Sequence, residues 1–104
     1  MVNWKDLIKR LPAKVQVARN RHMEILWTHI VSGDGDTLGE MRPDKNQIVL
    51  KTDETAKETI HTYIHELLHA VSDQYDAGLT EKQVRSLEKA IYYMLKPGNI
   101  FKGD

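Results

Sequence analysis

The sequence predicts an α+β fold, in which a short N-terminal helix and a small antiparallel sheet of three or four strands precede two longer helices. Apolar residues recur at every third or fourth position near both ends of the chain, which favours helices there. In the middle, short apolar segments alternate with turn-forming residues, which favours strands. The chain has 104 residues, so we expect one domain over 1–104, with a frayed tail at 97–104.

The first part of the chain is expected to contain one helix and two strands. Apolar residues in 4–11 fall at helical spacing, Asn3 can cap this helix, and Pro12 ends it. The segment 14–18 is short and favours a strand. The segment 22–31 has alternating apolar side chains and predicts a longer strand.

A β-hairpin is expected next. The segments 38–41 and 47–51 have the composition of short strands. Between them, 42–46 supplies Pro, Asp and Asn, which are typical turn residues.

Two helices are expected to complete the domain. The first runs to about Tyr75, and Gly78 stops it. Thr80 and Gln83 form a capping box for the second, which ends before Pro97. The candidate N-caps of the first helix are Thr52, Asp53 and Thr55. Its apolar stripe consists of Ile60, Ile64, Leu67, Leu68 and Val71.

Composition excludes several classes of function. There are 15 basic and 15 acidic residues, and this balance argues against a dedicated nucleic-acid binder or a polybasic membrane anchor. A basic stripe on the second helix is expected to be a solvated face; it consists of Lys82, Arg85, Lys89 and Lys96. Without cysteine, a bound metal must use His, Asp or Glu. No apolar run is long enough for a membrane span and 1–10 lacks a signal-peptide core, so we expect a cytoplasmic protein.

One motif carries clear chemical information: His65-Glu66-Leu67-Leu68-His69. Residues four apart share a helix face, so the two imidazoles can bind one Zn²⁺. Glu66 lies about 100° around the helix from His65, where it can reach a metal-activated water without binding the metal itself. The motif therefore predicts a zinc site in which Glu66 is the general base.

A catalytic zinc site needs a third protein ligand and one open position. The candidates in this sequence are Asp73, Asp76, His61, His29, Glu81 and Glu88. His61 and Asp73 extend the four-residue spacing of the motif, and three such side chains span about 12 Å along the helix. A single ion bound by all three of these side chains would collide with the middle one. We therefore expect His61 and Asp73 to hold an imidazole by its other nitrogen instead.

Glu88 is the favoured third ligand. If the chain folds back at Gly78, Glu88 returns beside His69 on the inward face of its helix. A carboxylate within an apolar stripe needs a partner, and a metal supplies one. The alternative is an ion pair between Glu88 and Arg85 on the same helix. Glu81 shares this face, but its place in the first helical turn is explained by the helix dipole.

With the motif at 65–69 and Glu88, the segment 38–95 resembles gluzincin-type zinc metallopeptidases, and is similar to the very small HExxH proteins encoded by phages and prophages. The resemblance implies a zincin-like fold, with a helix that bears both histidines and a glutamate helix packed against it. It also implies that one edge strand binds an extended peptide by backbone hydrogen bonds. We assign that role to the strand of Gln47, Ile48, Val49, Leu50 and Lys51.

The sequence also departs from this family. Larger gluzincins have an Asp four residues after the glutamate ligand, where this chain has Tyr92. The orienting role would then fall to Asp73, His61, Tyr92 itself or a backbone carbonyl. Larger members also have a downstream domain with a transition-state-stabilising side chain, and we expect no counterpart of it here. The candidate substitutes are Tyr63, Tyr75, Tyr92 and Tyr93.

The sequence therefore predicts a zinc-dependent peptidase with one Zn²⁺ per chain, acting on a specific protein or peptide. The alternative is a non-catalytic interaction module, such as a phage protein that binds a host factor. Glu66 distinguishes the two, because a structural metal site has no use for a general base.

Overall fold

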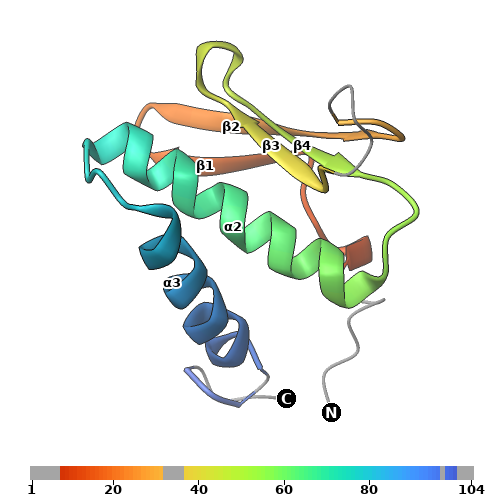
Figure 1. Ribbon diagram of the computed structural model, residues 1–104. Coiled ribbons are helices and arrows are strands. Elements are labelled where there is room, and N and C mark those ends of the chain that lie inside the picture. Colours follow the sequence, from red (N-terminus) through yellow and green to blue (C-terminus); the bar gives the residue numbers. More distant parts are fainter. Residues whose placement is uncertain (1–7, 32–36, 97, 101–104) are drawn as a thin grey trace.

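The computed structural model describes residues 8–31, 37–96 and 98–100. It confirms the α+β class: four strands form one small sheet, and two long helices follow (Figure 1). In chain order the elements are β1 Lys14–Ala18, β2 Arg21–Thr28, β3 Gly39–Arg42, the short 3₁₀ helix η1 Pro43–Lys45, β4 Gln47–Lys51, α2 Ala56–Tyr75 and α3 Glu81–Met94.

The molecule has three layers. Helix α2 lies across one face of the sheet and contacts β1, β3 and β4 (Figure 1). Helix α3 packs against α2 on the side away from the sheet. Neither helix is long and apolar enough to cross a membrane. Of the expected N-terminal helix, residues 8 and 9 are helical, and its earlier part lies outside the described residues. Most of the expected frayed tail also lies outside them.

The prediction of an antiparallel sheet was wrong, because the sheet is mixed. Its strand order is β1-β2-β4-β3. β3 pairs with β4 in antiparallel fashion, as expected for the predicted hairpin, and β1 pairs with β2 in the same way. β2 and β4, however, run parallel, with Ile25 opposite Ile48 and Trp27 opposite Leu50. After β2 the chain forms β3 at the outer edge of the sheet. The hairpin then returns as β4, which lies between β3 and β2.

The predicted edge strand is therefore an inner strand. Ile48, Val49 and Leu50 of β4 are all buried. Strands that are covered on both faces have continuous apolar runs. The run of these three residues therefore indicates an inner strand. β3 is the edge strand beside β4, and it also contacts α2.

Two apolar clusters join the layers. Residues from the sheet and from α2 form the first: Met23, Ile25, Ile48, Leu50 and Ala70. The second joins α2 to α3 and contains Ile60, Ile64 and Tyr92. These clusters fix the face that α2 turns toward α3.

Local capping defines both helices. The Thr55 side chain accepts a hydrogen bond from the Glu58 N–H and caps α2. Helix α2 ends at Tyr75 because Asp76 adopts the left-handed conformation, with φ 50°. Thr80 and Gln83 form the expected capping box of α3. The turn between the helices thus begins at Asp76, before the Gly78 stop that the sequence suggested.

Candidate metal centre

Two histidines of α2 face the start of α3. His65 and His69 lie one helical turn apart, and their Nε2 atoms are 3.2 Å from one another. Both side chains are partly exposed, because the buried face of α2 is occupied by Ile60 and Ile64. The motif therefore directs two imidazole nitrogens to one point, as the sequence predicted.

Glu81, the first residue of α3, completes this cluster. Its Oε1 lies 2.6 Å from Nε2 of His65 and 3.2 Å from Nε2 of His69. These three ligand atoms lie within 4.8 Å of one another and can hold a metal ion. The capping box fixes the first turn of α3, so it also fixes the position of Glu81.

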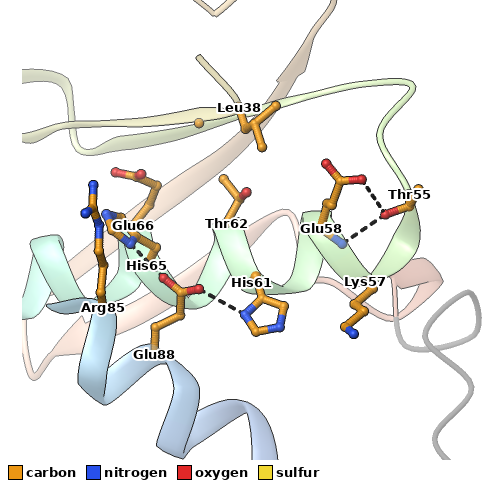
Figure 2. A pocket seen from close by; sticks show the side chains of 11 residues that line it. Leu38, Thr55, Lys57, Glu58, His61, Thr62, His65, Glu66, Arg85 and Glu88 are labelled. Atoms are coloured by element: carbon orange, nitrogen blue, oxygen red, sulfur yellow. Dashed lines mark hydrogen bonds and ion pairs between the residues drawn. The ribbon is translucent and has the colours of Figure 1, made fainter. Parts of the chain in front are cut away.

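Glu88, the expected ligand, contacts Nδ1 of His65 rather than the Nε2 atom that faces Glu81; Figure 2 shows Glu88 between His65 and His61. Its Oε1 accepts a hydrogen bond from Nδ1 of His65 at 2.7 Å, and its Oε2 is 2.9 Å from Nδ1 of His61. The side chain is only 17 % exposed. The structure thus assigns Glu88 to orienting His65, and brings Glu81 to the Nε2 atoms instead.

The position of the turn explains this difference. The chain folds back at Asp76, before the fold-back at Gly78 assumed from the sequence, so that an earlier turn of α3 lies beside His69. Ser72 helps to fix the turn, since its backbone oxygen accepts from Ala77 and its Oγ from Leu79. As a result His69 meets Glu81 rather than Glu88.

The donor set fits a tetrahedral divalent ion. Ligands at about 2.0 Å from a tetrahedral zinc lie about 3.3 Å from each other. Two of the three separations in the cluster are 3.2 Å, and the third is shorter, at 2.6 Å. The Glu88 carboxylate accepts from Nδ1 of His65, so a neutral His65 ring would keep its proton on Nδ1 and offer Nε2 to a metal ion.

The carboxylates around His65 also affect its protonation. Burial lowers the pKa of His65, but hydrogen bonds and charges from Glu88, Glu66 and Glu81 outweigh it and raise the pKa above its ordinary value. A metal ion that binds here competes with this proton, so its affinity falls at acid pH.

Glu66 lies next to the cluster and points toward β3. Its side chain is only 8 % exposed. Burial raises its pKa above the ordinary value, against the opposing effects of His65, His69 and a backbone hydrogen bond with Met41. A buried carboxyl with a raised pKa is a stronger base than a solvated one, which suits proton transfer.

A glycine allows β3 to approach Glu66 closely. A Cβ on Gly39 would collide with Cγ2 of Thr62 and would come within 3.4 Å of Cγ of Glu66. The absent side chain therefore brings the edge strand against this part of α2. The role of Gly39 could not be predicted from the sequence, because its contacts with α2 leave no signal in the local pattern.

The cluster borders a groove of about 730 Å³. Figure 2 shows its walls: Leu38 beside β3, side chains of α2 along its floor, and two residues of α3. His65 and Glu66 lie at one end of the groove, together with Arg85 and Glu88, and Thr55 and Lys57 lie at the other.

The remaining candidates have other places. Nδ1 of His61 contacts Glu88, and its ring stacks on the buried Tyr92 with centroids 4.0 Å apart. Both thus support the carboxylate that orients His65. Asp73 instead accepts a hydrogen bond from Arg21 at 2.8 Å. The groove is lined by none of the candidate tyrosines: Tyr63, Tyr75, Tyr92 and Tyr93.

The proposed peptide-binding strand needs a correction. Gln47–Lys51 is β4, which is paired on both sides by β2 and β3, so it cannot accept another strand. The edge beside the groove is β3.

No protein-family model matches this sequence, and no curated protein or solved structure is significantly similar to it. The resemblance to gluzincins therefore remains a prediction from the motif.

Proposed function

We propose that the protein is a zinc-dependent peptidase, with one Zn²⁺ per chain held by His65, His69 and Glu81. The main support is that three ligand atoms converge within 4.8 Å beside a buried glutamate, at the end of a groove. Two imidazoles with one carboxylate are a common ligand set of catalytic zinc, which keeps one position open. Bound zinc would supply polarisation of the peptide carbonyl and a lowered pKa for water.

Glu66 is the general base in this proposal. Its carboxylate accepts the proton of the attacking water and later transfers it to the leaving amine. Its raised pKa supports both steps, because a group that binds protons more readily accepts and returns one near neutral pH. Its hydrogen bond with Met41 limits the rotation of the carboxylate.

Glu88, His61 and Tyr92 position the site without contacting the metal. Glu88 fixes the tautomer and the orientation of His65. His61 holds the second oxygen of Glu88, and Tyr92 packs on the His61 ring. In the zincin-like arrangement that we propose, Glu88 therefore contacts the ligand His65 and not the metal itself.

The substrate is an extended peptide that binds along β3. The outer edge of β3 has no strand partner among the described residues, and Leu38 and Gly39 form one wall of the groove. Backbone hydrogen bonds to a strand edge bind peptides with little regard to side chains. Cleavage then takes place where the peptide passes His65 and Glu66.

Metal content and hydrolysis together test the proposal. Wild-type protein should bind one zinc and cleave members of a mixed peptide library, as followed by mass spectrometry. Glu66→Gln should keep its zinc and lose about 10²-fold or more in rate, because it lacks the base. Removal of zinc by a chelator should abolish cleavage and re-addition should restore it. Wild-type rates in Glu66→Gln would contradict the proposal.

A non-catalytic metal-binding interaction module is the second candidate. It is favoured by one observation, that no tyrosine lines the groove to stabilise a transition state. This candidate predicts that Glu66→Gln changes neither zinc binding nor the affinity for a partner.

A further inference from the structure

We infer that Arg85 binds a carboxylate of the peptide in the groove, so that the preferred substrates are acidic close to the bond that is cleaved. The cleavage of such peptides rests on the proposed function, whereas the binding of a carboxylate by Arg85 depends only on the groove and its charges.

Arg85 belongs to the groove by its position on α3. It lies four residues after Glu81 and three before Glu88, so it shares their side of the helix. Its side chain lines the groove and is exposed, and Figure 2 shows it at the same end as His65 and Glu66. A peptide that passes the metal centre therefore passes Arg85.

The acidic side chains of the groove already have partners. Glu88 has one oxygen on His65 and the other on His61. Glu58 accepts a hydrogen bond from the Thr55 hydroxyl. Glu66 is buried and hydrogen-bonded to the backbone of Met41.

The basic side chains of the groove have none. In the part of the chain that the structure describes, neither Arg85 nor Lys57 forms an ion pair or a side-chain hydrogen bond. Two other arginines do, since Arg21 is paired with Asp73 and Arg42 with Glu40. The ion pair between Arg85 and Glu88 that was considered from the sequence is not formed, because both oxygens of Glu88 are taken by histidines.

Arg85 and Lys57 lie at opposite ends of the groove. Lys57 lies eight residues before His65 on α2, which is about 12 Å along the helix. Arg85 is therefore the groove cation at the metal end. A guanidinium binds a carboxylate through two parallel hydrogen bonds, which makes it the better residue for selecting one. That carboxylate can come from an Asp or Glu side chain or from the C-terminus of the peptide.

Peptide binding to the metal-free full-length chain tests this inference without any hydrolysis. The probes are three fluorescein-labelled, alanine-rich octapeptides: one with a central Glu and an amidated end, one with Gln and an amidated end, and one with Gln and a free carboxylate. We expect the first or the third to bind about tenfold to hundredfold more tightly than the second in fluorescence anisotropy, the usual range for a charge-assisted hydrogen bond. The peptide that shows the gain identifies the source of the carboxylate.

Variants on the same helix face provide the controls. Arg85→Gln should abolish the preference and Arg85→Lys should retain part of it. Lys89→Gln removes the same charge from an exposed residue that does not line the groove, and should retain the preference fully. Equal binding of the three peptides, no measurable binding at millimolar concentration, or a preference that survives in Arg85→Gln would each overturn the inference. An equal loss in Lys89→Gln would also overturn it, because it would indicate a general charge effect.

The outcomes separate this inference from the proposed function. If the chain binds carboxylate peptides through Arg85 but never hydrolyses them with zinc, only the proposed function fails. If the zinc-loaded chain hydrolyses all three peptides at the same rate, and does so equally in Arg85→Gln, only the inference fails.

Discussion

Two glutamates of α3 contact the same imidazole from opposite sides, and they contribute to the site differently. Glu81 approaches Nε2 of His65 and is 48 % exposed, whereas Glu88 approaches Nδ1 and is 17 % exposed. A residue that supplies a ligand atom and one that orients a ligand should differ in their effects on metal affinity.

This difference can be measured by zinc titration against a chromophoric chelator. Glu88→Gln should weaken zinc binding by about 10-fold to 100-fold, since the orienting hydrogen bond is altered. Glu81→Ala should weaken it further, because a ligand atom is lost. Glu24→Gln on β2 is the control and should have no effect. Wild-type affinity in Glu81→Ala, with a larger loss in Glu88→Gln, would restore Glu88 as the ligand.

The burial of Glu66 should be visible in the pH dependence of stability. Its pKa is raised in the folded state, so above the ordinary value of about 4.3 the folded state holds this proton longer than the unfolded state. The contribution of Glu66 to the free energy of unfolding therefore falls as the pH rises from its ordinary pKa toward its raised pKa in the folded state. In metal-free protein, Glu66→Gln should gain stability relative to wild type between pH 4 and pH 8 in denaturant unfolding. A difference that does not change with pH would show that burial does not govern this carboxyl.

At the scale of single residues, the sequence predicted the site where spacing alone determines it. His65, Glu66 and His69 share one helix, so a four-residue spacing is enough to place them. The third ligand depends on where the chain folds back between the helices. The end of α2 near Tyr75 was predicted, but the fold-back was placed at Gly78, whereas Asp76 already takes the left-handed conformation, and this choice depends on the hydrogen bonds of the whole turn.

At the scale of elements, the contact between β3 and α2 depends on Gly39. Gly39→Ala places a methyl group against Thr62 and should cost about 1–3 kcal/mol, as overpacking does. Thr62→Ser removes the Cγ2 atom in the collision, so the double variant should recover most of this loss. Denaturant unfolding measures both. A Gly39→Ala protein as stable as wild type would show that β3 does not lie this close to α2.

The N-terminus of α3 links helix capping to metal binding. Thr80→Ala breaks the capping box and should cost about 1 kcal/mol of stability. Because Glu81 is the next residue, zinc affinity should fall as well. Ser86→Ala, in the middle of the same helix, is the control and should leave zinc affinity unchanged. Unchanged zinc binding in Thr80→Ala would argue against a ligand in this first turn.

The helices and strands were easier to predict than the pairing of the strands in the sheet. The four strands, the hairpin at β3 and β4, and the capping box of α3 follow from local sequence, whereas Thr55 was one of three candidate caps for α2. The parallel pairing of β2 with β4 does not, because it joins segments that are separated by another strand. The buried run at Ile48, Val49 and Leu50 was the available signal that β4 lies inside the sheet.

At the scale of the whole molecule, a bound metal would join α3 to α2. Helix α3 packs mainly on α2, and the ligands come from both helices. Zinc at about 100 times its dissociation constant should therefore raise the free energy of unfolding by about 2.7 kcal/mol. His69→Ala should abolish this gain. An equal gain in His69→Ala would place the zinc elsewhere.

Crystals grown with zinc, measured at the zinc absorption edge, would test the central claim most directly. We expect one anomalous peak per chain, about 2.0–2.2 Å from Nε2 of His65, Nε2 of His69 and a carboxylate oxygen of Glu81. Glu88 should remain on Nδ1 of His65. The absence of a peak at this point, or a peak bound by Glu88 in place of Glu81, would contradict the account.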